Sequence, residues 1–211
     1  MSKDFYAILG CHSSGSSALA GSLYHLGVDL GEHLWGMYGS APIYGGEDYE
    51  LSKILEAILP LPNTYTDYTQ KQLLDIFTIY LSRRYKHQKG PIAAKYPTLA
   101  VFGDTLLGLL EDKLKVIFCD RDIDKSILSL HKRYPDVDLD KISNLQRFIY
   151  HSATSLLEKL PEDRKIIVNY EDTCAKPEET IKRVAEFMKL NPTEAQLKAA
   201  VGHIDIKQKH I

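Results

Sequence analysis

The segment from Gly10 to Ser17 has the composition of an anion-binding loop: Gly, Cys, His, Ser, Ser, Gly, Ser, Ser. A strand-like apolar run precedes it, and a leucine-rich, helix-like stretch follows it. Small residues at such a junction let backbone N–H groups point into a concavity at the N-terminus of a helix, where the helix dipole adds positive potential. The segment is therefore predicted to bind a phosphate or sulfate group.

The spacing of Gly10 and Gly15 is that of a Walker A loop, but the sequence then departs from that motif. A Walker A loop continues with Lys after the second glycine, whereas Ser16 stands there in this chain. The lysine that reaches the β- and γ-phosphates is therefore missing, which disfavours an ordinary ATP- or GTP-hydrolysing enzyme. A second interpretation stays open, namely a Ser- and Gly-rich turn in which Ser16 or Ser17 caps the helix.

Short β-rich runs alternate with longer amphipathic runs, which is typical of a parallel sheet with crossover helices on both faces. The predicted buried strands are residues 5–9, 92–95, 116–119 and 166–168. The predicted helices are residues 16–26, 51–59, 70–84, 99–110, 124–133, 142–160, 178–190 and 194–201. The anion-binding loop joins the first strand to the first helix, and one α/β domain over residues 1–211 is expected. The glycine-rich stretch 31–46 is predicted to form a lid or a substrate wall.

The 211-residue chain carries 26 basic and 28 acidic side chains, a formal net charge of −2. Binding nucleic acid through many phosphates needs a cationic surplus, so no nucleic-acid partner is expected. No apolar run approaches the roughly 20 residues that cross a bilayer, which predicts no membrane partner and a cytoplasmic location. Cys11, Cys119 and Cys174 are too few and too scattered for a disulfide framework or a zinc site, and no metal site is expected.

The loop resembles the 5′-phosphosulfate-binding loop of the sulfotransferases that use 3′-phosphoadenosine 5′-phosphosulfate (PAPS). In the bacterial branch of that family the loop runs Gly, two variable residues, Arg or Lys, Ser, Gly and two hydroxyl residues. Residues 26–31 are also similar to that branch. The resemblance implies a three-layer αβα fold of the P-loop NTPase type, PAPS as cofactor and 3′,5′-ADP as product. It assigns cofactor binding to Ser13, Ser14, Gly15, Ser16 and Ser17.

One position departs from the family pattern. Where the family carries Arg or Lys, this chain has Ser13. The family's cation stabilises the charge that builds up on the leaving nucleotide, and losing one such donor lowers the rate by about 10²–10³. We hypothesise that Lys95 or His12 partly replaces it. Lys95 ends a predicted strand at a position where the family carries a Lys near the transferred group, and its long stem gives it reach.

Two further positions resemble the family's 3′-phosphate site. In sulfotransferases a strand ends in an Arg, and a Ser eight residues later lies on the following helix; Arg121 and Ser129 have that spacing. A guanidinium can bind a phosphate through two hydrogen bonds, and a hydroxyl two helical turns further along lies on the same helix face. The alternative is a solvated surface cluster in which the guanidinium pairs with Asp120, Asp122 or Asp124.

The general base is assigned by a further resemblance. Many cytosolic members use a His two residues after a Lys, but here Tyr-Pro follows Lys95. Bacterial and heparan-type members instead place a Glu-Asp pair between a glycine and a helix, and Glu47 resembles that Glu. Glu47 is thus the hypothesised base, with Asp48 and Glu50 as substitutes. The alternative is a carboxylate that serves only the dipole of the helix that follows.

Together these motifs predict an enzyme that transfers a sulfuryl group from PAPS to a hydroxyl or amine of a small-molecule or glycan acceptor. Residues 170–172, a Tyr-Glu-Asp run similar to the family's, support the fold. Tyr65, Tyr68 and Tyr80 could line an acceptor pocket or pack elsewhere. Two alternatives remain: a P-loop small-molecule kinase, which needs the missing loop lysine, and a non-catalytic nucleotide-binding relative. The sequence determines neither the acceptor nor the oligomeric state.

Overall fold

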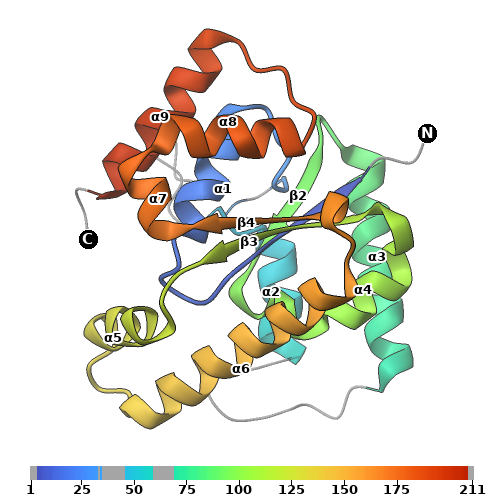
Figure 1. Ribbon diagram of the computed structural model, residues 1–211. Coiled ribbons are helices and arrows are strands. Elements are labelled where there is room, and N and C mark those ends of the chain that lie inside the picture. Colours follow the sequence, from blue (N-terminus) through green and yellow to red (C-terminus); the bar gives the residue numbers. More distant parts are fainter. Residues whose placement is uncertain (1–3, 33, 35–45, 59–68, 209–211) are drawn as a thin grey trace.

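Figure 1 shows the protein as a computed structural model, which describes residues 4–32, 34, 46–58 and 69–208. Within these residues, four strands form one parallel sheet in the order β2-β1-β3-β4. In the central pair, Phe5 of β1 lies opposite Leu114 of β3, and Leu9 lies opposite Phe118. The strands are β1 Phe5–Leu9, β2 Ile92–Lys95, β3 Leu114–Asp120 and β4 Lys165–Asn169.

Helices fill the connections between the strands, because parallel pairing requires crossovers rather than tight hairpins. The α-helices are α1 Ser16–His25, α2 Tyr49–Ile58, α3 Gln70–His87, α4 Gly103–Leu110, α5 Ile123–Arg133, α6 Leu139–Lys159, α7 Tyr170–Ala175, α8 Pro177–Phe187 and α9 Glu194–Gln208. Short 3₁₀ segments are Pro97–Phe102, Glu111–Lys113 and Glu162–Arg164.

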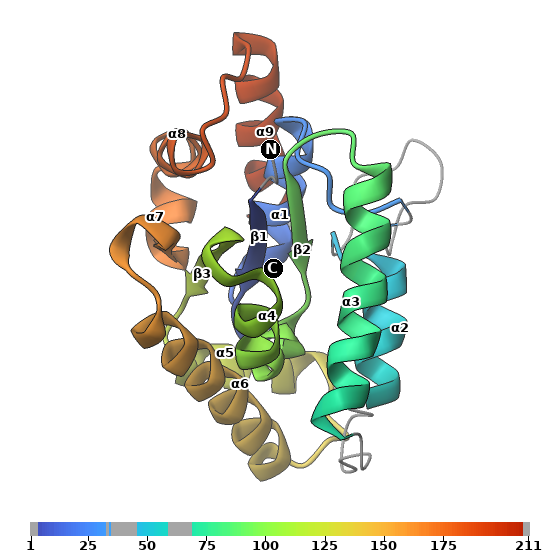
Figure 2. The ribbon, with the colours of Figure 1, turned by 90° about the vertical axis from the view of Figure 1, so that its right-hand side faces the viewer.

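The helices cover both faces of the sheet. Along β1, Phe5, Ala7 and Leu9 pack on one side, while Tyr6 and Ile8 pack on the other, because successive side chains of a strand point to opposite faces. The first side is covered by α2, α3, α4 and α6, and the second by α1, α8 and α9 (Figures 1 and 2). The predicted three-layer αβα fold with a central parallel sheet is confirmed.

The strand predicted at 166–168 is correct in type but is not fully buried. β4 is an edge strand of the described sheet, and Ile167 is 52% exposed. Arg183 Nη2 donates to the carbonyl oxygen of Ile167 at 2.7 Å, so a side chain covers part of this edge. An apolar run predicts burial from composition alone, whereas an edge strand has a neighbour on one side only.

Several helices differ from the prediction: α9 extends to Gln208 rather than ending at 201, and α7 was not predicted. The helix predicted at 99–110 is divided into the 3₁₀ segment that Pro97 begins and α4, which starts at Gly103. Tight 3₁₀ turns of this kind are common at the starts of α-helices. The helix predicted at 178–190 is shorter, because α8 ends at Phe187 and Lys189 adopts a left-handed φ of 54°.

Of the residues predicted to form a lid or to line an acceptor pocket, the structure describes only some. Residues 33 and 35–45 of the predicted lid lie outside the described residues, as do Tyr65 and Tyr68. Tyr80 is only 1% exposed and belongs to the core on the α2–α3 side of the sheet, so it does not line an open pocket. Its placement follows from the apolar face of α3, on which Phe77 and Leu81 are also buried.

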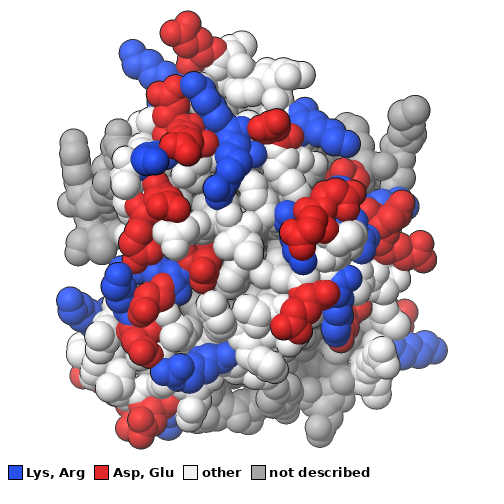
Figure 3. Space-filling model, in the orientation of Figure 1, with Lys and Arg blue, Asp and Glu red and all other residues white. Residues whose placement is uncertain are grey.

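The distribution of charged side chains on the surface agrees with the nearly equal numbers of basic and acidic residues. On the face shown in Figure 3, lysines and arginines are interspersed with aspartates and glutamates. None of the helices that the structure describes has the length and apolar character to span a membrane.

Candidate active site

The loop between β1 and α1 is shaped by residues in the left-handed region. Ser13 has φ 65° and Gly15 has φ 85°, and Gly15 precedes the first residue of α1. Among the described residues no side chain caps this helix end, so its first N–H groups are open to a ligand. The alternative in which Ser16 or Ser17 caps the helix is therefore wrong. A Cβ at Gly15 would lie 2.5 Å from the Tyr170 ring, which makes glycine necessary there.

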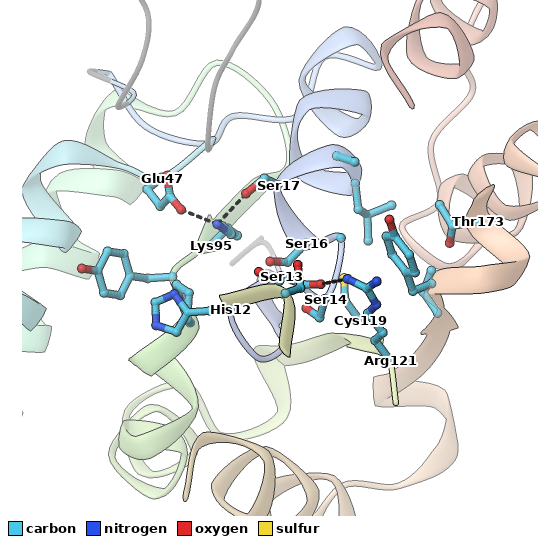
Figure 4. A pocket seen from close by; sticks show the side chains of 18 of the residues that line it. His12, Ser13, Ser14, Ser16, Ser17, Glu47, Lys95, Cys119, Arg121 and Thr173 are labelled. Carbon is cyan, nitrogen blue, oxygen red and sulfur yellow. Dashed lines mark hydrogen bonds and ion pairs between the residues drawn. The ribbon is translucent and has the colours of Figure 1, made fainter. Parts of the chain in front are cut away.

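A cavity of about 420 Å³ opens beside this loop, at the carboxyl ends of the strands. This is where open α/β sheets bind ligands, because the loops that follow neighbouring parallel strands meet there. Figure 4 shows the cavity with most of the predicted site residues labelled. The structure brings all of them to its wall: His12, Ser13, Ser14, Gly15, Ser16, Ser17, Glu47, Lys95, Arg121 and Ser129.

Several polar atoms of these residues are buried without a partner. Among the described residues, Ser13 Oγ, Ser14 Oγ, His12 Nε2 and Arg121 Nε have no hydrogen bond. Buried polar groups are nearly always paired in folded proteins. Because all four residues line the cavity, the unpaired atoms fit a polar, anionic ligand bound against the loop.

Arg121 follows β3 and is directed at the phosphate loop. Its Nη1 donates to the carbonyl oxygen of Ser13 at 2.6 Å, and its guanidinium carbon lies 4.1 Å from the centre of the Tyr170 ring. The alternative surface cluster is not formed among the described residues, because each neighbouring aspartate has another partner. Asp120 accepts from Tyr150, Asp122 caps α5 and Asp124 pairs with Arg147.

Lys95 and Glu47 form an ion pair at the opposite side of the loop (Figure 4). Lys95 ends β2 and is only 3% exposed, and its Nζ also donates to Ser17 Oγ at 2.9 Å. A buried ammonium must be paired to remain charged, and Glu47 supplies that charge. The pair therefore places one cation and one carboxylate next to the start of α1.

The two substitute bases are engaged elsewhere. Asp48 is 3% exposed and accepts hydrogen bonds from Arg84 at 2.9 Å and from the Tyr80 hydroxyl at 3.0 Å. Burial raises the pKa of Asp48, and the charge of Arg84 opposes that rise. Glu50 pairs with the exposed Arg83 at 2.6 Å. Neither Asp48 nor Glu50 lines the cavity, whereas Glu47 does.

Arg84 was not predicted, yet it holds the segment that carries Glu47. Its guanidinium is 6% exposed, and besides Asp48 it donates to the carbonyl oxygens of Asp29 at 2.8 Å and Ala93 at 3.0 Å. One side chain of α3 thus joins β2, the segment after α1 and the start of α2. No motif marks these residues, because they lie far apart in the sequence.

Gln146 on α6 is a second unpredicted residue, and it holds the phosphate loop. Its side chain is fully buried. The Oε1 atom accepts from the N–H of His12 at 3.0 Å, and Nε2 donates to the carbonyl oxygen of the same residue at 2.8 Å. The carboxamide therefore pairs with both the backbone N–H and the backbone carbonyl of one residue, as the backbone of a neighbouring strand would. The only sequence signal is a polar residue on the apolar face of a predicted helix, between Ile142 and Ile149.

His12 is neutral at physiological pH. Burial, and after it the charges of Lys95 and Arg133, lower the pKa of His12 from its ordinary value of 6.5 to about 4. His12 therefore does not supply the charge of the family's loop cation near pH 7, which leaves Lys95 of the two hypothesised residues.

Among the described residues, no disulfide joins Cys11, Cys119 or Cys174. Burial raises the pKa of both Cys11 and Cys119 to about 12, so neither is a reactive thiolate. Within the described residues, no group of three His, Cys, Asp or Glu side chains is placed to hold a metal ion.

Comparisons with known proteins agree on the fold. The sulfotransferase domain of the Synechococcus PCC 7002 olefin synthase is 19% identical, with a TM-score of 0.62 over 94% of this chain and 78% of that one. A sulfotransferase from Mycobacterium avium is 11% identical, with a TM-score of 0.64 over 99% and 68%. Retinol dehydratase, solved with androsterone and the inactive cofactor PAP, is 13% identical, with a TM-score of 0.55 over 97% and 65%.

The sequence comparisons address the family directly. No curated protein sequence gives a significant match. The family model of the sulfotransferase domain matches residues 83–210, which is more than half of the chain and includes Lys95, Arg121 and Ser129. The phosphate loop lies before the matched region. The chain therefore belongs to the sulfotransferase domain family and is a transferase enzyme.

Proposed function

We propose that the protein transfers a sulfuryl group from PAPS to a hydroxyl or amine of a small-molecule or glycan acceptor. One observation carries the proposal: a phosphate loop with unpaired hydroxyls, Arg121 and the Lys95–Glu47 pair meet in one cavity. When bound, PAPS supplies an activated sulfuryl group and is converted to 3′,5′-ADP. Membership of the sulfotransferase family argues against the alternative of a P-loop kinase.

The residues around the loop fit a nucleotide with two anionic groups. The open N–H groups at the start of α1 and the unpaired hydroxyls of Ser13 and Ser14 would hold the 5′-phosphosulfate. Arg121, whose Nε is unpaired, and Ser129 would hold the 3′-phosphate. That retinol dehydratase was solved with the inactive cofactor PAP supports the same cofactor class here.

Glu47 is the proposed general base. It lines the cavity and pairs with Lys95, and its carboxylate can accept a proton from the acceptor. Once Glu47 is protonated, the ammonium of Lys95 loses its counter-charge. It is then available to stabilise the negative charge that develops on the transferred group.

Lys95 also takes the place of the family's loop cation in this proposal. Ser13 cannot supply a charge, and His12 is neutral because its pKa is lowered to about 4. Lys95 Nζ lies 2.9 Å from Ser17 Oγ, so a cation already contacts the loop. The dual use of one lysine distinguishes this site from the family pattern.

Calorimetry tests the cofactor. We expect 3′,5′-ADP to bind, ATP to bind more weakly, and Arg121→Ala to weaken 3′,5′-ADP by about 10-fold or more, because a charge-assisted phosphate contact is lost. Arg147→Ala, which removes an exposed ion pair with Asp124 and an exposed hydrogen bond to Ser143, is the matched control and should bind normally. A preference for ATP, or unchanged 3′,5′-ADP binding in Arg121→Ala, contradicts the proposal.

Turnover of labelled PAPS with a pool of alcohols and amines tests the chemistry. Glu47→Gln should lower the rate by about 10²–10⁴ and leave 3′,5′-ADP affinity unchanged, because the base acts on the acceptor. Ser13→Arg should raise the rate, since it restores the loop cation. Undiminished turnover in Glu47→Gln would show that another group takes the proton.

A further inference from the structure

Gln146 contacts more than the phosphate loop, because its carboxamide also reaches α5. Its Nε2 donates to the carbonyl oxygen of Ser126 at 3.3 Å, in addition to the two hydrogen bonds that the carboxamide forms with His12. The two N–H groups of the amide therefore have one carbonyl each, on two different elements. Among the described residues, no other side chain is hydrogen-bonded to both the loop and α5.

The two elements that this carboxamide joins carry the two phosphate subsites of the proposed site. Ser13 directly follows His12 and belongs to the subsite for the 5′-phosphosulfate. Ser129 lies one helical turn beyond Ser126 on α5 and belongs to the subsite for the 3′-phosphate. Both subsites open into the same cavity. The buried side chain of Gln146 is therefore placed to fix the separation between them.

α6, which carries Gln146, also contacts both elements in other ways. The thiol of Cys11 donates to the backbone carbonyl oxygen of Gln146 at 3.4 Å. Ile142 of α6 packs with Ile127 and Leu130 of α5 in a small buried cluster, and the two helices lie side by side (Figure 1). Because these contacts remain when the carboxamide is removed, its loss should leave the elements packed together and release the loop relative to α5.

The separation matters for a nucleotide that carries two phosphates on one ribose. The ribose holds its 3′- and 5′-phosphates a limited distance apart, so both subsites bind fully only when the protein holds them at the matching separation. A nucleotide with one phosphate makes no such demand. A change in the separation should therefore weaken a bisphosphate more than a monophosphate.

We propose that Gln146 is a positioning residue that sets the separation of the two phosphate subsites, so that the site prefers a 3′,5′-bisphosphate nucleotide to the 5′-monophosphate. The inference rests on the proposed function and deepens it. It gives α6 a part in recognising the cofactor, although none of the described residues of α6 lines the cavity.

Calorimetry with 3′,5′-ADP and 5′-AMP tests this role. The ratio of the two affinities measures the gain from the 3′-phosphate, which in the wild type should be on the order of 10–100-fold for a charge-assisted contact. Gln146→Leu should reduce this ratio by about 5-fold or more, the size of the coupling between groups in one network. Gln70→Leu makes the same chemical change at an exposed position of α3 and should keep the wild-type ratio.

The ratio separates positioning from simpler roles. If Gln146 only orders the loop, or only stabilises the fold, both nucleotides weaken alike and the ratio falls by less than about 5-fold, which overturns the inference. Arg121→Ala already removes a contact to the 3′-phosphate, so adding Gln146→Leu to it should lower the ratio little further. A second fall of the same size in that double variant would also overturn the inference.

A milder variant covers the case in which Gln146→Leu does not fold. Gln146→Asn keeps the amide but is one methylene shorter, so it cannot hold both His12 and Ser126. The ratio should fall in this variant too, and an unchanged ratio contradicts the inference.

Failure of the proposed function looks different. A wild type that binds 5′-AMP as tightly as 3′,5′-ADP has no 3′-phosphate subsite, and the inference then falls with the proposed function. A wild-type preference for 3′,5′-ADP that the Gln146 variants keep leaves the proposed function standing and overturns this inference alone.

Discussion

Gln146 holds the phosphate loop from a helix 134 residues further along the chain, through two hydrogen bonds to His12. Gln146→Leu keeps a side chain of similar size and removes both bonds. It leaves the N–H and the carbonyl oxygen of His12 without partners, at roughly 1–3 kcal/mol each when buried. His12 as a whole residue is only half-buried, so water reaches part of this region. We therefore expect the free energy of unfolding to fall by about 2–4 kcal/mol.

Urea unfolding measures this loss, and calorimetry measures its effect on the site. Affinity for 3′,5′-ADP should fall as well, because Ser13 and Ser14 directly follow the residue that is released. Gln70→Leu makes the same chemical change at an exposed position of α3 and should alter neither quantity. A loss below about 1 kcal/mol with unchanged 3′,5′-ADP affinity would refute the claim that this carboxamide positions the loop.

Two further predictions concern buried charge. Arg84→Met leaves the Asp48 carboxylate buried without its cation and should lower the free energy of urea unfolding by about 3–5 kcal/mol. Arg83→Met, which breaks an exposed pair with Glu50, should lower it by less than about 1 kcal/mol; equal effects would contradict the prediction. For His12, the folded pKa of about 4 lies below the ordinary 6.5, so between these values the unfolded chain binds a proton that the folded protein does not. Stability should therefore fall as the pH drops from 6.5 to 4, by up to about 3 kcal/mol. His12→Gln should reduce this dependence of stability on pH. A pKa near 6.5 for His12, measured by NMR, would disprove the prediction.

The order of strands and helices is determined largely by the sequence. Apolar residues repeat every two positions in a strand and about every 3.6 in a helix. A stretch of a few residues therefore shows both the type of element and the face that it buries. The phosphate loop is equally local, because Gly10 to Ser17 are contiguous and their small size is what the turn requires. The places where prediction failed, the exposed face of β4 and the break before α4, depend on neighbours elsewhere in the chain.

The arrangement of the site beyond the loop was decided by the tertiary structure. The sequence marks Lys95, Glu47 and Arg121 only by their similarity to a family pattern, and it says nothing of the pairing between the first two. β2 lies beside β1, which brings Lys95 to the start of α1, and the contact of Arg84 with Asp48 holds the segment that carries Glu47 beside it.

The residues that hold or complete the site leave little local trace in the sequence, and for Gln146 the only one is its place on the apolar face of a predicted helix. Gln146 contacts the loop because α6 packs across the sheet, and Arg84 meets Asp48 because α3 lies against α2. Arg133 reaches the cavity because the last turn of α5 lies at its wall. Each contact joins residues far apart in the sequence, and only the packing of helices on the sheet determines which side chains meet. The local pattern thus specifies the elements and the anion-binding loop, while tertiary packing supplies the residues that position the loop and complete the cavity beside it.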